Sequence, residues 1–302
     1  MKASALKKSL FLFPMCQISA GFFSENSRKI SEKRLFVTRK VFCKVQEFGR
    51  IKLSFFERRT KNSMIKIENV SKSYGSHKAV DGMSVMIPDG SITGFIGHNG
   101  AGKTTTINMI TGALKPDTGT IEVNGFDISK QPLDARRQFV AVPDSPDMFL
   151  RLTGIEYINF MADIYKVPQE VRDEQIMALA KDFGMEDKLS NQMESYSHGM
   201  RQKAIVIAAL VCNPPVWILD EPMVGLDPAA AFVVKNKMKE HAQNGNSVFF
   251  STHVLEVAEK LCDKIVLIDG GKIYFNGTVD QLKADHPGKE LEEIFMEVVT
   301  YA

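Results

Sequence analysis

The sequence predicts an α/β fold with a mostly parallel core sheet, because short apolar runs alternate with segments of helical periodicity from residue 64 onward. Two departures from this alternation refine the prediction. The segments near 65–86 and 119–127 have no helix between their strands, which indicates an antiparallel β subdomain. Between residues 153 and 189 helical patterns follow one another without a strand, which indicates a helical subdomain at about 145–200.

The individual elements are predicted from the length and period of each run. The apolar runs that we expect to be strands are 65–70, 92–96, 139–143, 216–219, 247–251 and 264–268. The segments that we expect to be helices are 103–112, 154–164, 169–183, 199–211, 229–243 and 254–260. Strands that alternate with helices in this way form a parallel sheet with both faces covered.

Composition is typical of a globular protein preceded by a basic segment. The 302 residues are 44% hydrophobic and 25% charged, which excludes disordered and collagen-like chains. Residues 1–63 carry 15 Lys and Arg against 4 Asp and Glu, whereas residues 64–302 carry 23 against 32. The cysteines have no spacing typical of a zinc site or a disulfide framework, so we expect reduced thiols at Cys16, Cys43, Cys212 and Cys262.

The basic N-terminal extension, residues 1–63, leaves three interpretations open. Its start is similar to a secretory signal, since lysines precede an uncharged run at 9–24. A regular apolar and polar alternation begins only at Met64, and we therefore favour Met64 as the natural start, with 1–63 disordered or not native. A segment that binds a charged surface is the third interpretation. No uncharged run in the sequence reaches the roughly 18 apolar residues that a membrane span needs.

The segment GHNGAGKT at 97–104 has the pattern of a phosphate-binding loop. It follows the apolar run 92–96 and precedes a helical pattern, which is the context that distinguishes such a loop from a glycine-rich turn. Its glycines permit a tight turn with inward amide groups, and the helix N-terminus favours an anion. Lys103 would reach the β- and γ-phosphates, and the Thr104 hydroxyl would bind Mg²⁺. The expected nucleotide-binding residues of this loop are Gly97, His98, Asn99, Gly100, Ala101, Gly102, Lys103, Thr104 and Thr105.

An acidic pair, Asp220 and Glu221, follows the apolar run 216–219. We expect Asp220 to hold the metal and Glu221 to polarise the attacking water. An acidic pair after a strand is often only a solvated strand end, but behind a phosphate loop we expect it to be catalytic. His253 lies 33 residues after Asp220, and we expect it to hydrogen-bond the γ-phosphate as a further catalytic residue.

Together with YSHGM at 196–200 and GLDP at 225–228, these motifs resemble those of ATP-binding subunits of ABC transporters, from Met64 to the C-terminus. The resemblance implies a P-loop NTPase of the ABC-ATPase fold that binds ATP and Mg²⁺ and hydrolyses the nucleotide between two copies. YSHGM stands where the family usually has LSGGQ, the signature that contacts the ATP of the other copy. The resemblance assigns this contact to Ser197, His198, Gly199 and Met200. Taken alone, YSHGM would be an ordinary helix cap at Ser197.

The resemblance implies three further site residues. Tyr74 matches the aromatic residue that stacks on adenine, with a plain surface tyrosine as the alternative. Asp227 matches the loop that crosses the dimer interface. Asp144 stands where the family usually has a glutamine that senses the metal and the attacking water, so it would be a metal ligand and a catalytic residue. Its negative charge near the phosphates departs from the family pattern.

The form of the signature also implies a partner. His198 and Met200 are similar to the YSxGM pattern of ATPases that serve separately encoded export permeases, so we expect a separate transmembrane permease and a second ATPase protomer, identical or related. The subunit would then be cytoplasmic and peripheral, held on the inner face of the cell membrane through the permease. Its permease contact would include Met148, Phe149 and Leu150, for which core packing is an equal alternative.

Two other functions fit the sequence less well. Family members that act on DNA carry a long coiled coil between the phosphate loop and the signature, and translation-associated members carry two cassettes. The compact single cassette of this chain has neither feature. Residues 64–302 are acidic, so no nucleic acid partner is expected. A small-molecule kinase is the other alternative, but such an enzyme would not need the motifs at 196–200 and 225–228.

Overall fold

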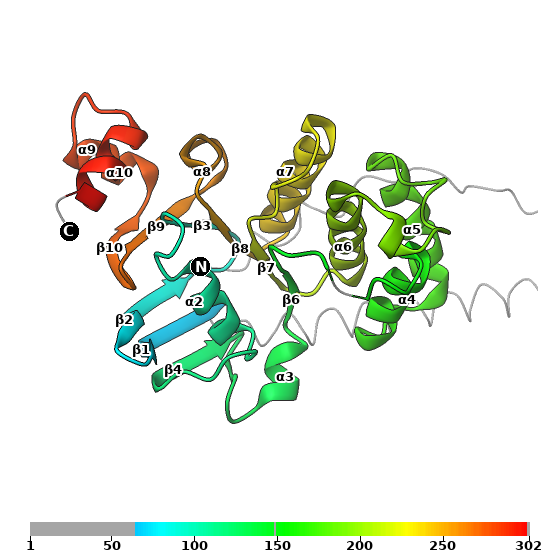
Figure 1. Cartoon of the computed structure of the whole chain (residues 1–302), viewed down its shortest axis with the longest axis horizontal. Coiled ribbons are helices and arrows are strands. Elements are labelled where there is room, and N and C mark those ends of the chain that lie inside the picture. Colours follow the sequence, from blue (N-terminus) through cyan, green and yellow to red (C-terminus); the bar gives the residue numbers. More distant parts are fainter. Residues whose placement is uncertain (1–63, 148, 301–302) are drawn as a thin grey trace, which may run out of the picture. The chain divides into compact units, whose positions relative to one another are not determined.

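The computed structural model describes residues 64–147 and 149–300 (Figure 1). The predictions made for residues 1–63 and for Met148 lie outside the described residues. Within the described part, no helix is both long and apolar enough to cross a membrane.

The core is a six-stranded sheet with strand order β10-β9-β3-β8-β7-β6. Its parallel strands are β3 (Ile92–Ile96), β6 (Phe139–Val142), β7 (Val216–Asp220), β8 (Ser247–Thr252) and β9 (Lys264–Asp269). The edge strand β10 (Lys272–Gly277) pairs with β9 in the antiparallel direction. The predicted mostly parallel sheet is therefore confirmed.

Both faces of this sheet are covered, which explains why its strands are continuous apolar runs. Ile218 and Phe249 pack on the side of strand β1 (Ile65–Tyr74) and helix α2 (Lys103–Ile110), whereas Leu219 and Phe250 pack on the side of α7 (Pro228–Gln243). Figure 1 shows α7 and α8 (Leu255–Leu261) on one face and α2 on the other.

The antiparallel β subdomain is also confirmed. Its strand order is β2-β1-β4-β5, and its strands are β1 (Ile65–Tyr74), β2 (His77–Ile87), β4 (Thr118–Val123) and β5 (Phe126–Asp127). The two segments predicted near 65–86 and 119–127 thus join in one sheet, because β1 pairs with both β2 and β4. Alternate residues of β1, including Ile65 and Ile67, are buried against the same apolar cluster as α2.

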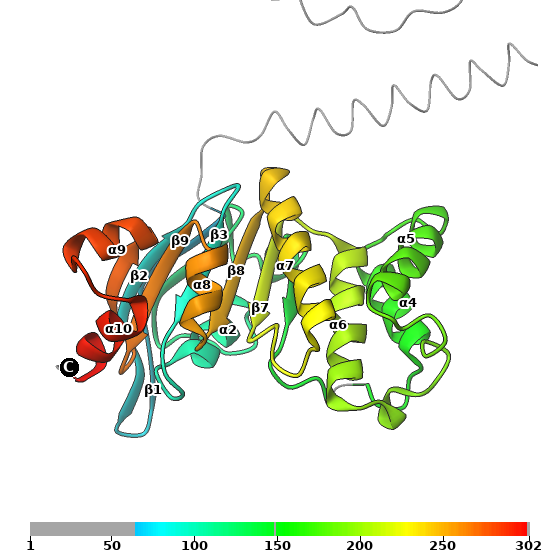
Figure 2. The same ribbon diagram turned by 90° about the horizontal axis from the view of Figure 1, so that it is seen from above.

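The predicted helical subdomain consists of α4 (Gly154–Ile164), α5 (Gln169–Asp182) and the first turns of α6 (His198–Cys212), with a short 3₁₀ turn, η2 (Met193–Ser195). Helix α4 begins at a capping box, in which the Thr153 side chain accepts from the Glu156 amide and the Glu156 side chain accepts from the Thr153 amide. Figure 2 shows α7, α6 and the pair α4 and α5 in succession. One apolar cluster connects them to β7, so the subdomain is packed on the core sheet.

Besides the short turn η2, the sequence pattern missed four elements among the described residues. They are α3 (Pro132–Arg136), β10, α9 (Val279–Asp285) and α10 (Leu291–Thr300). Helix α3 has only five residues, too few for a visible period. Helix α9 begins at a capping box between Thr278 and Gln281, which is a local signal that the sequence contained.

Candidate functional site

The loop between β3 and α2 is packed so closely that two of its glycines are required. A Cβ on Gly97 would lie 2.6 Å from the Ile268 carbonyl oxygen, and a Cβ on Gly102 would lie 2.5 Å from the Ala79 carbonyl oxygen. Gly102 also has φ +106°, in the left-handed region that favours glycine. The loop therefore has the compact glycine path that the sequence predicted, and α2 begins directly behind it at Lys103.

Lys103 folds back over this loop. Its Nζ donates to the carbonyl oxygens of Gly97 at 2.7 Å and His98 at 3.2 Å. The same Nζ lies 3.7 Å from Oε1 of Glu221, and the Lys103 side chain is 6% exposed. A buried positive charge is thus held at the mouth of a glycine-rich loop and a helix N-terminus, which is the combination that binds phosphate.

The carboxyl ends of β7 and β8 bring the acidic pair and the histidine together. In the parallel register Asp220 lies opposite Ser251. The Ser251 hydroxyl donates to the Asp220 carboxylate and accepts from the Glu221 backbone amide at 3.0 Å. His253 Nδ1 lies 2.9 Å from Glu221 Oε1, so the structure places His253 beside the predicted catalytic carboxylate. Glu221 has φ +47°, a strained conformation for a non-glycine residue.

The three predicted metal ligands line one cavity of about 360 Å³ between α2 and the ends of β6 and β7. These ligands are Thr104, Asp144 and Asp220. One hydroxyl and two carboxylates are hard oxygen donors of the type that Mg²⁺ prefers. Over residues 64–147 and 149–300, no group of three or more His, Cys, Asp or Glu side chains is placed to hold a metal. The donor set fits Mg²⁺ bound together with phosphate oxygens.

The signature segment packs against the loop that precedes α7. Ser197 caps α6, and its hydroxyl accepts from the Met200 amide at 3.3 Å. A Cβ on Gly199 would lie 2.4 Å from the Gly225 carbonyl oxygen, and a Cβ on Gly225 would lie 2.5 Å from the His198 ring. The two motifs are therefore held in contact by glycine at both positions.

Asp227 joins the same unit. It caps α7 by accepting from the Ala230 amide at 2.9 Å, and its carboxylate lies 2.5 Å from Lys203 Nζ on α6. The hydrogen bond from Lys203 and the capped amides hold the pKa of Asp227 below its usual value. An ion pair thus links the second turn of α6 to the N-terminus of α7.

The remaining predicted residues that the structure describes are at least partly exposed. Tyr74, at the end of β1, is 53% exposed and pairs with His77 of β2. His77 is two residues before Ala79, whose carbonyl oxygen lies close to Gly102 of the phosphate loop. Phe149 is 47% exposed, and its ring centroid lies 5.6 Å from that of Tyr157 and 5.5 Å from that of Phe160. Leu150 is half-buried, and its carbonyl accepts from the Glu194 amide.

Sequence reasoning missed three functional contacts. It gave the Ser251 hydroxyl no role, because the strand register that places Ser251 beside Asp220 is a tertiary property. It also missed Lys203, whose partner Asp227 is 24 residues away, and Asp269, whose carboxylate pairs with His98. No local motif signals such pairs, since each partner lies on a different element.

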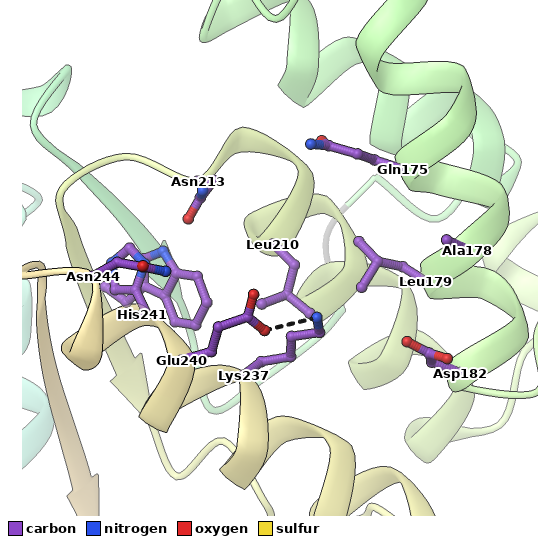
Figure 3. A pocket seen from close by; sticks show the side chains of 11 residues that line it. Gln175, Ala178, Leu179, Asp182, Leu210, Asn213, Lys237, Glu240, His241 and Asn244 are labelled. Carbon is purple, nitrogen blue, oxygen red and sulfur yellow. Dashed lines mark hydrogen bonds and ion pairs between the residues drawn. The ribbon is translucent and has the colours of Figure 1, made fainter. Parts of the chain in front are cut away.

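A second cavity, of about 230 Å³, is separate from this site (Figure 3). Its lining includes Asn213 and Asn244, which cap the C-terminal ends of α6 and α7, whereas the signature and Asp227 are at their N-terminal ends. The rings of Trp217 and His241 stack in its wall with centroids 3.8 Å apart. Burial lowers the pKa of His241 to about 4.

Comparison with known proteins agrees with this geometry. Residues 80–224 match the family profile described as ABC transporter. The chain is 32% identical over 238 residues to the ABC-type transporter ATP-binding protein EcsA of Bacillus subtilis (strain 168), a match that covers 78% of this chain and 96% of EcsA. It is 33% identical to the daunorubicin/doxorubicin resistance ATP-binding protein DrrA of Streptomyces peucetius, over 73% of this chain and 67% of that protein.

A solved structure of an ATP-binding subunit of an ABC transporter also superimposes on the chain. Its TM-score is 0.75 at 31% identity, and the match covers 78% of this chain and 99% of that structure. The fold, the phosphate loop and the relatives agree: this chain belongs to the family of ABC transporter ATP-binding proteins, and it is an ATP-binding and ATP-hydrolysing subunit.

Proposed function

We propose that this chain drives export through a separate membrane permease, by hydrolysing MgATP at sites that two protomers build together. The observation that carries the proposal is the cluster at the carboxyl ends of β7 and β8, where Lys103 and His253 both lie within 4 Å of Glu221. A carboxylate between a phosphate-binding lysine and a histidine is placed to orient water toward a bound γ-phosphate.

The proposed hydrolysis divides the work among these residues. The 97–105 loop holds the phosphates of ATP, and Lys103 neutralises part of their charge. Glu221 orients water for in-line attack, while His253 contacts the γ-phosphate. Mg²⁺ would be held by Thr104, Asp220 and Asp144 and would neutralise charge on the β- and γ-phosphates.

The second protomer supplies the other half of each site. ATPases of this family dimerise and work with a membrane permease. The N-terminus of α6, with Ser197 and the Gly199 amide, would bind the γ-phosphate of the opposite protomer because a helix N-terminus favours an anion. The ion pair between Lys203 and Asp227 supports the proposal, since it joins the signature helix to the loop expected at the dimer interface.

The permease contact is proposed at the surface around Phe149. The half-exposed Phe149 and Phe160 rings form an apolar patch that a short helix of a partner could cover. Tyr74 is proposed to stack on adenine, as its exposed ring permits. The direction of transport is proposed as export because DrrA is named for resistance to daunorubicin and doxorubicin and because the signature has the YSxGM form. The subunit would sit on the inner face of the membrane through its permease.

The test replaces Glu221 with Gln. Glu221→Gln should lower the turnover of ATP by about 100-fold and trap an ATP-bound dimer, because the amide cannot polarise water while binding is kept. Size-exclusion chromatography with and without MgATP measures the dimer. Glu240→Gln, at the far end of α7, is the matched control and should hydrolyse ATP normally. A Glu221→Gln protein that stays monomeric with ATP and turns over at the normal rate would refute the assignment.

A further inference from the structure

The turn between β9 and β10 lies against the outer side of the phosphate loop. The Gly271 amide donates to the Ala101 carbonyl oxygen at 3.1 Å. The Ile268 carbonyl oxygen approaches Gly97 so closely that a Cβ there would lie at 2.6 Å. Backbone from the edge of the sheet therefore contacts the loop at both its first glycine and its fifth residue.

A side-chain pair adds a third contact. Nε2 of His98 pairs with the Asp269 carboxylate, and Nδ1 of the same ring lies 2.7 Å from the Asn99 carbonyl oxygen. A carboxylate and a carbonyl oxygen only accept, so the ring is the donor in each hydrogen bond that forms. His98 thus bridges the 15% exposed Asp269 carboxylate and the loop backbone.

The bond to Asn99 fixes the direction of one loop amide. In a planar trans peptide the C=O and the following N–H point in opposite directions. Because the Asn99 carbonyl points at the His98 ring, the Gly100 N–H must point away from that ring. The loop can bind phosphate only while such amides keep their orientation.

We propose that Asp269 is a positioning residue for ATP binding: it holds the His98 ring, which in turn orients the Asn99–Gly100 peptide of the phosphate loop. This proposal rests on the proposed phosphate-binding role of residues 97–105. Asp269 itself does not touch the nucleotide, and its effect is transmitted through His98. His98 and Asp269 act on ATP binding rather than on the attacking water, because they lie at the ends of β3 and β9 whereas Glu221 and His253 follow β7 and β8.

The test measures KM for ATP and kcat separately in the full-length protein. Asp269→Asn and His98→Asn should each raise KM by about fivefold and change kcat by less than about twofold, because a uniform binding interaction is lost. The double variant should be no worse than either single variant, since both changes break the same link. Asp269→Glu retains the charge and should restore KM to within about twofold.

Two controls separate this proposal from a structural effect and from the proposed function. Asp173→Asn, on the exposed face of α5, removes a negative charge far from the loop and should leave KM unchanged. Lys103→Ala should abolish ATP binding. A lowered melting temperature of Asp269→Asn with unchanged KM, or multiplicative effects of the two single changes, would overturn the positioning role. Unaltered ATP binding by Lys103→Ala would instead overturn the proposed function of the loop.

Discussion

Ser251 offers the sharpest test of how the proposed catalytic residues at the carboxyl ends of β7 and β8 are held in place. Its hydroxyl donates to the buried Asp220 carboxylate and accepts from the Glu221 amide at 3.0 Å. Ser251→Ala leaves both groups without this partner. Each unpaired group costs about 1–3 kcal/mol, so the free energy of unfolding should fall by about 2–6 kcal/mol.

Part of this loss should appear in the reaction barrier, because the lost bond anchors the strained backbone of Glu221. Every 1.4 kcal/mol corresponds to about tenfold in rate, so kcat for ATP should fall by about 10- to 100-fold. The assay combines steady-state ATP hydrolysis with urea unfolding. KM should change little, since the phosphate loop is untouched.

Ser247 provides a matched control on the same strand. It is as fully buried as Ser251, and its hydroxyl donates to the Pro88 carbonyl oxygen at 2.8 Å, at the opposite end of β8. Ser247→Ala should cost about 1 kcal/mol of stability and leave kcat within about twofold. The reasoning is refuted if Ser251→Ala keeps normal kcat, or if Ser247→Ala lowers kcat equally.

Two further predictions concern the signature and the second cavity. Gly199→Ala should lower the rate of ATP hydrolysis by more than about tenfold, because the new Cβ would lie 2.4 Å from the Gly225 carbonyl oxygen and would displace the signature segment. Equilibrium binding of ATP to the isolated chain should stay normal. Equal loss of binding would contradict this. Burial lowers the pKa of His241 from 6.5 to about 4, so between these pH values the unfolded chain binds more protons than the folded protein. The stabilisation from a neutral His241 is therefore complete above pH 6.5 and is lost as the pH falls toward 4. At pH 5 the free energy of unfolding should be about 2 kcal/mol lower than at pH 7, and His241→Gln should remove this difference. Urea unfolding, followed by the fluorescence of Trp217, the single tryptophan, measures the free energy of unfolding. A wild-type protein that is equally stable at both pH values would disprove the prediction.

Most of the core could be predicted from the sequence because its elements have strong local patterns. The runs ending at Ile96 and Leu219 are short and apolar and are followed by polar or turn residues, so their strands and the segments behind them were recognised. Helix α4 was predicted with its observed bounds, 154–164, from its helical period, and the structure adds a capping box at its start.

Contacts between distant elements could not be predicted in the same way. The packing of Gly199 on Gly225 and the bond between Ser251 and Asp220 depend on strand order and helix packing, which no local pattern encodes. Edge strand β10 was missed because its alternate residues are exposed and its apolar signal is weak. The sequence identified the residue types of the site, whereas the structure supplied their partners.

The dependence of ATP hydrolysis on protein concentration tests the central claim most directly, because a site built from two protomers must vanish when they separate. Specific activity is measured at saturating MgATP over a dilution series, with the oligomeric state followed by analytical ultracentrifugation. The proposed arrangement predicts that specific activity falls as the protein is diluted, in step with loss of the dimer. Full specific activity from a monomer at every dilution would contradict it.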